Sequence, residues 1–214
     1  ESDRLKKKRS NISKADSFMQ RYKLINQQAI RCVACGERIT LLLSVQGLLF
    51  QFGTVNGTYL PPKQVIIGEY DDAINLNNIE VLQISVSAPS IESHGEMNDH
   101  CACIINKPNK NLYTWGSNDY GQLGLGNTSF QKTPQAVREI REKVCDVSCG
   151  PKYTIAVNDT NQVFSFGLNS KGQLGLSQRL QKVRKETEVQ GLDRVYHTIW
   201  NGSTADKLSP QVVE

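Results

Sequence analysis

No apolar run in the sequence approaches the ~18 residues that a membrane-spanning helix needs, so no membrane span is expected. The N-terminus, Glu1 to Arg9, lacks the apolar core of a secretory signal. It also lacks an initiator methionine, and from this we expect a fragment or a processed chain. These absences favour a protein located inside the cell.

Catalytic side chains are also scarce. The histidines are His94, His100 and His197, and none stands in a recognisable triad with serine or cysteine. No paired carboxylates are framed by apolar residues, as a general acid and base would require. The string Gly121–Gly126 has neither the G-x-G-x-x-G spacing of a dinucleotide site nor the Gly-Lys-Ser/Thr of a phosphate-binding loop. The sequence therefore predicts no enzyme activity and no cofactor.

Positive charge is concentrated at one end of the chain. The formal net charge is +4, and residues 1–28 alone contain eight Lys/Arg against three Asp/Glu. The remainder is electrically balanced, and a balanced surface is a poor footprint for phosphates. Nucleic-acid binding or nuclear import is expected only through the basic run, whose members are Arg4, Lys6, Lys7, Lys8 and Arg9. We favour a solvated tail for this run.

The main positive feature is an internal repeat. Leu112–Leu125 recurs almost letter for letter as Val163–Leu176, and every paired glycine keeps one offset of 51 residues. Each copy contains a short apolar strand, a turn, an aromatic strand and a glycine-rich bend, which is typical of a β-propeller blade. We therefore predict an all-β fold of antiparallel blades. Its signature positions are Gly36, Gly53, Gly116, Gly121, Gln122, Leu123, Gly124, Gly150, Gly167, Gly172, Gln173, Leu174 and Gly175.

Four copies can be aligned, which predicts an incomplete ring. The expected blades are about 29–80, 81–143, 144–194 and a partial one at 195–214, of which 203–214 is a truncated or divergent tail. A Pro-x-x-Val motif occurs at Pro62, Pro134 and Pro210. The first copy lacks Gly-Gln-Leu-Gly after Gly53, and the third lacks a proline at the expected place, near Lys185.

These residues resemble the regulator of chromosome condensation (RCC1-type) repeat family over about residues 29–202. The family carries a Cys-Gly-x-x-His-Thr-like start, an aromatic strand ending in glycine, and Asn-x-x-Gly-Gln-Leu-Gly, which stands here at Asn118–Gly124 and Asn169–Gly175. WD and kelch propellers do not explain Gly-Gln-Leu-Gly. The resemblance implies a ring of seven blades, which this chain is too short to close. The rest of the ring is then either missing from the sequence or supplied by another chain.

The six cysteines allow two interpretations. Cys32 and Cys35 have zinc-knuckle spacing, and Cys101 and Cys103 lie close to His100. A structural zinc needs four converging ligands, whereas reduced, buried cysteines suit tight inner strands. We favour reduced structural cysteines and predict no metal site.

Two segments outside the repeat pattern are candidate contact elements. The second copy contains an insertion, Ser87 to His100, and loops on a rigid scaffold commonly carry binding residues. Its candidate partner-binding residues are Ile91, Glu92, His94, Glu96 and Met97. The N-terminal extension, residues 1–28, is basic and contains a pattern for a short amphipathic helix beginning at Ser13. A disordered loop and a plain linker are the respective alternatives.

The sequence favours a non-catalytic protein–protein interaction scaffold, part of a larger multi-subunit assembly. One alternative is guanine-nucleotide exchange on a small GTPase, as the resemblance implies, because exchange needs no covalent chemistry. The other is the propeller module of a larger kinase or ubiquitin ligase. The expected location is the cytoplasm or the cytoskeleton, including the cilium, with the nucleus as a further option.

Overall fold

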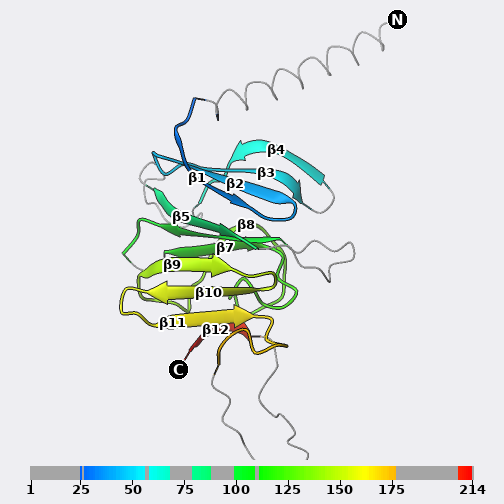
Figure 1. Cartoon of the computed structure of the whole chain (residues 1–214), viewed down its shortest axis with the longest axis vertical. Coiled ribbons are helices and arrows are strands. Elements are labelled where there is room, and N and C mark those ends of the chain that lie inside the picture. Colours follow the sequence, from blue (N-terminus) through cyan, green and yellow to red (C-terminus); the bar gives the residue numbers. More distant parts are fainter. Residues whose placement is uncertain are drawn as a thin grey trace, which may run out of the picture.

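The structure is a computed structural model that describes residues 25, 27–55, 58–67, 79–87, 99–108, 111–176 and 207–213. These residues form three four-stranded antiparallel sheets that stack along the long axis of the molecule (Figure 1). The all-β prediction is confirmed, and the incomplete ring is consistent with the sheets observed. No helix among the described residues has the length and apolar character needed to cross a membrane.

In each sheet the strands are neighbours in chain order. The first sheet contains β1 (Ile30–Cys35), β2 (Ile39–Ser44), β3 (Leu49–Val55) and β4 (Thr58–Gln64). The second contains β5 (Val81–Val86), β6 (His100–Ile105), β7 (Leu112–Gly116) and β8 (Gln131–Ala136). The third contains β9 (Val144–Cys149), β10 (Tyr153–Asn158), β11 (Val163–Gly167) and β12 (Lys207–Val212).

The three sheets repeat the same backbone contacts. The first hairpin of each sheet is closed by an N–H that donates to a carbonyl, from Gly36 to Ile39, from Ser87 to His100 and from Gly150 to Tyr153, over 2.8–2.9 Å. Gly116 and Gly167 end the third strands with φ of 104° and 108°. A Cβ at either glycine would come within 2.6 Å of the carbonyl oxygen at the equivalent place in the first hairpin, Asp99 or Lys152. Their surroundings are therefore equivalent, as the repeat requires.

One prediction about the last residues was wrong. Lys207–Val212 were expected in a partial fourth copy and a divergent tail, but they form β12, the fourth strand of the third sheet. The Pro-x-x-Val motif explains this placement. In every sheet the backbone N–H of its valine donates a hydrogen bond to the carbonyl of the first residue of the third strand. The pairs are Val65 to Leu49, Val137 to Leu112 and Val213 to Val163, at 2.8–3.0 Å. Pro210 is thus the proline that the third copy lacked near Lys185.

The predicted boundary between residues 194 and 195 and the N-terminal segment 1–24 lie outside the described residues. The predicted helix at Ser13 lies there as well. The blade limits and the extension therefore stay predictions.

The core lies between the sheets. One buried cluster joins the first two sheets, with Leu41 and Leu43 of β2 packed with Cys103 of β6 and Trp115 of β7. A second joins the second and third sheets around Ile104, Val147 and Phe166. Alternate side chains of a strand point to opposite faces, so a central sheet buries both faces. This explains why every residue of β6 and β7 is buried.

Candidate functional site

We call the end of the sheets that joins first to second strands, and third to fourth strands, the loop end. It carries the connections 36–38 and 56–57 of the first sheet, 87–99 and 117–130 of the second, and 150–152 and 168–206 of the third. The hydrogen bonds between sheets described below link these connections to one another. The long second-sheet insertion and the long third-sheet connection both leave from this end, whereas the long connection between β4 and β5, residues 65–80, lies at the opposite end.

The Gly-Gln-Leu-Gly segment of the second sheet fills the seam between the second and third sheets at the loop end. Thr154 of β10 donates its hydroxyl to the carbonyl of Gln122 over 2.8 Å. Leu123 is fully buried, and a Cβ on Gly124 would lie 2.8 Å from the Phe166 ring. We call Gln122–Gly124 the plug. Its glycine is needed because a side chain there would collide with the aromatic ring of the next sheet.

Side chains of the same loop hold the plug in shape. Asn118 Oδ1 accepts the N–H of Leu123 at 3.0 Å, and Gln122 Oε1 accepts the N–H of Tyr120 at 2.9 Å. Thr114, the third residue of β7, donates its hydroxyl to the Leu123 carbonyl at 2.7 Å. The third sheet repeats this pattern at Asn169, Ser165 and Leu174. The conserved spacing of Asn, Gln and Leu in the two copies thus encodes one self-supporting turn.

The first sheet has no plug, because β3 and β4 are joined directly through residues 56–57. Gln51 stands at the third position of β3, where the other sheets have Thr114 and Ser165. Its side chain crosses the seam instead, and its Oε1 accepts the Trp115 Nε1–H at 2.9 Å. Trp115 and Gly116 correspond to Phe166 and Gly167, the residues against which the plug packs at the other seam.

A cavity of about 220 Å³ remains where the missing plug would lie. We call it the first-seam cleft. The residues that line it are Arg38, Ile39, Gln51, Thr54, Val55, Thr58, Leu60, Lys63, Asp99, Trp115, Gly116, Phe130, Gln131 and Lys132. Trp115 is buried at its inner wall, whereas Phe130 is 37% exposed and Lys63 and Lys132 are exposed. The cleft therefore has an apolar interior and a basic mouth.

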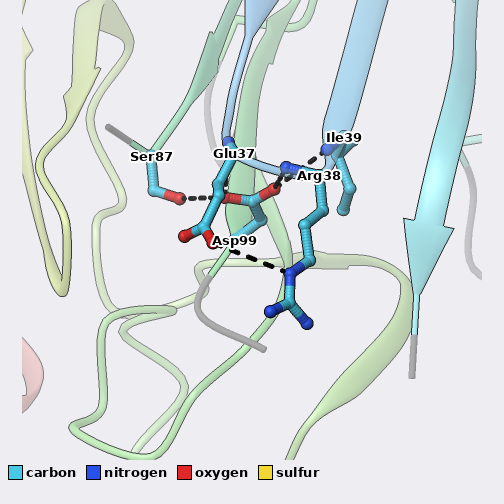
Figure 2. A network of polar contacts seen from close by, with 5 residues as sticks. All are labelled: Glu37, Arg38, Ile39, Ser87 and Asp99. Carbon is cyan, nitrogen blue, oxygen red and sulfur yellow. Dashed lines mark hydrogen bonds and ion pairs between the residues drawn. The ribbon is translucent and has the colours of Figure 1, made fainter. Parts of the chain in front are cut away.

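Asp99 closes the inner side of the cleft and is itself fully engaged. Its carboxylate accepts the backbone N–H groups of Glu37, Arg38 and Ile39 at 3.1, 2.5 and 2.9 Å, and the Ser87 hydroxyl at 3.3 Å (Figure 2). These bonds join the second-sheet insertion to the first hairpin of the first sheet. Several hydrogen-bond donors thus stabilise the charge of Asp99, and Lys63 and Lys132 at the mouth form no ion pair with it.

Arg38 is the third cation at the cleft. Its Nε lies 3.8 Å from Glu37 Oε1, and both side chains are about a third exposed (Figure 2). A long, exposed pair of this kind contributes little to stability. Lys63 and Lys132 form no ion pair with a described residue. The positive charge at the mouth is therefore available to a ligand.

His100 is a buried residue of the seam rather than a metal ligand. It stands at the histidine position of the repeat, and its Nε2 lies 2.8 Å from Thr154 Oγ1. Burial removes water from the imidazole and lowers its pKa to about 3, so the ring is neutral at physiological pH. No group of three or more potential metal-ligating side chains is found among the described residues.

The cysteines divide into two groups. Cys101, Cys103 and Cys149 are buried, and Cys32, Cys35 and Cys145 are exposed, all with free thiols. Burial raises the pKa of Cys149 to about 12 and raises those of Cys101 and Cys103 as well. These buried thiols are poor nucleophiles and poor metal ligands, because both roles need the thiolate.

The candidate partner-binding residues Ile91, Glu92, His94, Glu96 and Met97 lie outside the described residues, as does the basic run Arg4–Arg9. The two ends of the insertion are placed, because Ser87 and His100 exchange backbone and hydroxyl bonds of 2.9 and 3.1 Å. Sequence reasoning missed Gln51, Trp115 and the cations of the cleft. A glutamine at the position of Thr114 and Ser165, together with the lost Gly-Gln-Leu-Gly, was the available signal.

Comparison with known proteins gives the same assignment as the geometry. Two models described as "Regulator of chromosome condensation (RCC1) repeat" match residues 110–157 and 144–173. The ultraviolet-B receptor UVR8 of Arabidopsis thaliana is 34% identical over 151 residues, which are 70% of this chain and 32% of that protein. The X-linked retinitis pigmentosa GTPase regulator of Canis lupus familiaris is 38% identical over 89 residues, 41% of this chain and 8% of that protein.

A solved structure shows the same fold. The chain matches Prp20p from Saccharomyces cerevisiae with a TM-score of 0.57 and 15% identity, over 86% of this chain and 38% of that one. The chain thus spans a third or less of the length of these curated relatives. The repeated hairpin bonds, the plugs and these matches together show that the chain belongs to the regulator of chromosome condensation repeat family, whose fold is the β-propeller.

Proposed function

We propose that the chain is a non-catalytic scaffold that binds other proteins at its loop end. One observation carries the proposal: the frame is repeated in three sheets, and three of its departures from the repeat lie at the loop end. These departures are the insertion after Ser87, the connection after Gly175 and the lost plug of the first sheet. Rigid frames with variable connections commonly place binding residues on those connections.

The protonation states of the buried groups support a role without covalent chemistry. His100 and Cys149 are held in their neutral forms by burial, and neither faces a described group that would activate it as a nucleophile or base. Both belong to the packing between the second and third sheets. Function then depends on surfaces rather than on reactive side chains.

The scaffold is proposed to be part of a larger structure. Apolar side chains are exposed on β1 and just after β4, with Val33 at 54% and Ile66 at 72%. A propeller sheet that is open on one side leaves such groups and its strand edges uncovered. Further blades, in a longer protein or from another chain, are the proposed cover.

A guanine-nucleotide exchange factor is the second candidate. The structural match Prp20p is described by its binding to Gsp1p and histones, and the second-sheet insertion is the candidate contact element for such a role. Purified chain is incubated with a panel of nucleotide-loaded small GTPases, and nucleotide release is followed by fluorescence. A scaffold leaves the intrinsic release rate unchanged. Accelerated release from any GTPase would replace the scaffold proposal with exchange. The kinase or ubiquitin ligase module stays a prediction.

The scaffold proposal is tested by affinity capture from cell extract with quantitative mass spectrometry. The wild-type chain is compared with a variant in which residues 88–98 are replaced by a Gly-Ser linker, and with Lys143→Glu at the opposite end of the sheets. Proteins that bind the loop end are lost with the linker variant and retained with Lys143→Glu. An identical protein set on all three baits would contradict the proposal.

The cytoplasm or the cytoskeleton is the proposed location. All six cysteines are free, and two exposed ones, Cys32 and Cys35, lie only three positions apart on β1. Free exposed thiols are typical of a reducing compartment. Imaging of a fluorescently tagged chain tests the location.

A further inference from the structure

We propose that the first-seam cleft binds, in trans, an acidic peptide segment that presents a leucine followed by a glycine. The peptide would occupy the position that Gln122–Gly124 occupies at the second seam. The inference rests on the proposed scaffold function and names the site and the chemistry of its partner.

The receiving wall of the cleft matches the wall that receives the plug. At the second seam the plug packs on Phe166 and Gly167. A Cβ placed on Gly167 would lie only 3.1 Å from the Cα of Gln122. At the first seam Trp115 and Gly116 hold the same strand positions and line the cleft. Gly116 has a φ of 104°, close to the 108° of Gly167, and like Gly167 it has no side chain to cover the backbone of the cleft wall.

The plug itself defines what the wall accepts. It presents a leucine that is fully buried and a glycine that lies against an aromatic ring. The cleft volume of about 220 Å³ exceeds the roughly 150 Å³ of a cavity that accommodates benzene, so a leucine side chain fits. The wall of Ile39, Val55 and Trp115 gives that side chain an apolar environment.

Gln51 supplies the hydrogen bond that would hold the peptide backbone. Thr114 and Ser165, at the same strand position, donate to the carbonyl of the plug leucine at 2.7 and 2.8 Å. Gln51 is 5% exposed and lines the cleft, and its Oε1 accepts the hydrogen bond from Trp115. Its Nε2 group has no acceptor among the described residues. Because Gln51 lines the cleft, a peptide carbonyl bound there would supply that acceptor.

The cations of the mouth determine the charge of the partner. Arg38, Lys63 and Lys132 line the cleft. Among the described residues one carboxylate lines it, that of Asp99, and it is engaged by backbone N–H groups. A peptide with Asp or Glu on either side of its leucine would complement this mouth, and its binding would weaken as salt is added.

The test uses fluorescence anisotropy with a labelled peptide, Glu-Asp-Gly-Gln-Leu-Gly-Glu-Asp, and the full chain. Two control peptides replace Leu by Ala, or replace the four acidic residues by Lys. The chain variant Lys63→Glu/Lys132→Glu reverses the charge of these two residues at the mouth of the cleft. Lys143→Glu is the matched control at the opposite end of the sheets. Circular dichroism and thermal unfolding verify that all three chains fold alike.

The expected result is saturable binding of the acidic leucine peptide to the wild type and to Lys143→Glu. The alanine peptide should bind at least about tenfold more weakly, because its burial of apolar surface is smaller. The double charge variant should lose at least about tenfold in affinity, and the Lys-flanked peptide should not saturate. The proposal is overturned if the leucine and alanine peptides bind equally, if the charge variant binds like the wild type, or if no saturation occurs.

The two proposals can fail separately. If the peptide does not bind while affinity capture still depends on the loop end, the scaffold function stands and the assignment of the cleft falls. If capture is also independent of the loop end, the scaffold function falls too.

Discussion

His100 Nε2 lies 2.8 Å from Oγ1 of Thr154, and the two residues belong to different sheets. The Thr154 hydroxyl itself donates a hydrogen bond to the carbonyl oxygen of Gln122, also at 2.8 Å. The histidine is therefore the donor and stays in its Nε2–H form. This chain of bonds ties the second strand of the second sheet to the second strand of the third and to the plug.

Stability should fall in mild acid because of His100. Its pKa is about 3 in the folded chain, lowered by burial, against about 6.5 when unfolded. Between these values the unfolded state binds the extra proton, so the free energy of unfolding decreases as pH falls below 6.5. The loss from this one group should be about 2 kcal/mol between pH 7.5 and pH 5. Urea unfolding at the two pH values measures it.

The variant His100→Gln isolates this contribution. Carboxylates titrate equally in both chains, so the difference between wild type and variant reports His100 alone. If the free energy of unfolding falls equally in the two chains between pH 7.5 and pH 5, then His100 is not buried in its neutral form.

Thr114→Val should destabilise the second-sheet plug. The substitution keeps the shape of the side chain but leaves the buried carbonyl of Leu123 without its hydroxyl donor. An unsatisfied buried acceptor costs about 1–3 kcal/mol. Chemical denaturation measures the loss. Thr133→Val, on the exposed face of β8, is the matched control and should stay within about 0.5 kcal/mol of the wild type.

Two glycine substitutions should differ sharply. Gly116→Ala places a Cβ 2.6 Å from the Asp99 carbonyl oxygen at a φ of 104°, so both collision and backbone strain oppose it. We expect a loss of about 3 kcal/mol or more in the free energy of unfolding. Gly172→Ala has φ of 73° and open space, so only the strain of about 1 kcal/mol remains. Equal losses in thermal unfolding would show that Gly116 is not enclosed.

Alkylation should separate the cysteines into two sets. In the native chain, iodoacetamide should modify Cys32, Cys35 and Cys145, which are exposed. Cys101, Cys103 and Cys149 should react only after unfolding, because burial both raises the thiol pKa and blocks access. Mass spectrometry of peptides before and after addition of denaturant identifies the sites. Rapid native labelling of Cys103 would contradict the packing of β6.

Local features of the fold could be predicted from the sequence because they are repeated. Gly116 and Gly167 have the same spacing to the plug, and one backbone requirement accounts for both. β12 was misassigned because residues 168–206 separate it from β11, so Pro210 lost its expected spacing although its motif was intact. Spacing alone cannot reveal which strand a distant motif pairs with.

The candidate site was harder to predict. The missing Gly-Gln-Leu-Gly is visible in the sequence, but its consequence depends on what the next sheet presents. The bond from Trp115 to Gln51 joins residues 64 positions apart, and the aromatic-strand motif in which both stand does not indicate that they pair. Likewise, Asp99 gains its role only because the insertion brings it to the N–H groups of the first hairpin.

The late position of β12 has a consequence for synthesis on the ribosome. The first two sheets have all four strands once Ala136 has emerged, whereas the third must wait until Val212 is made. During that interval β11 presents an unpaired edge to the surroundings, which is where a nascent chain associates wrongly. The time taken to translate residues 168–212 therefore sets how long this edge of β11 stays unpaired.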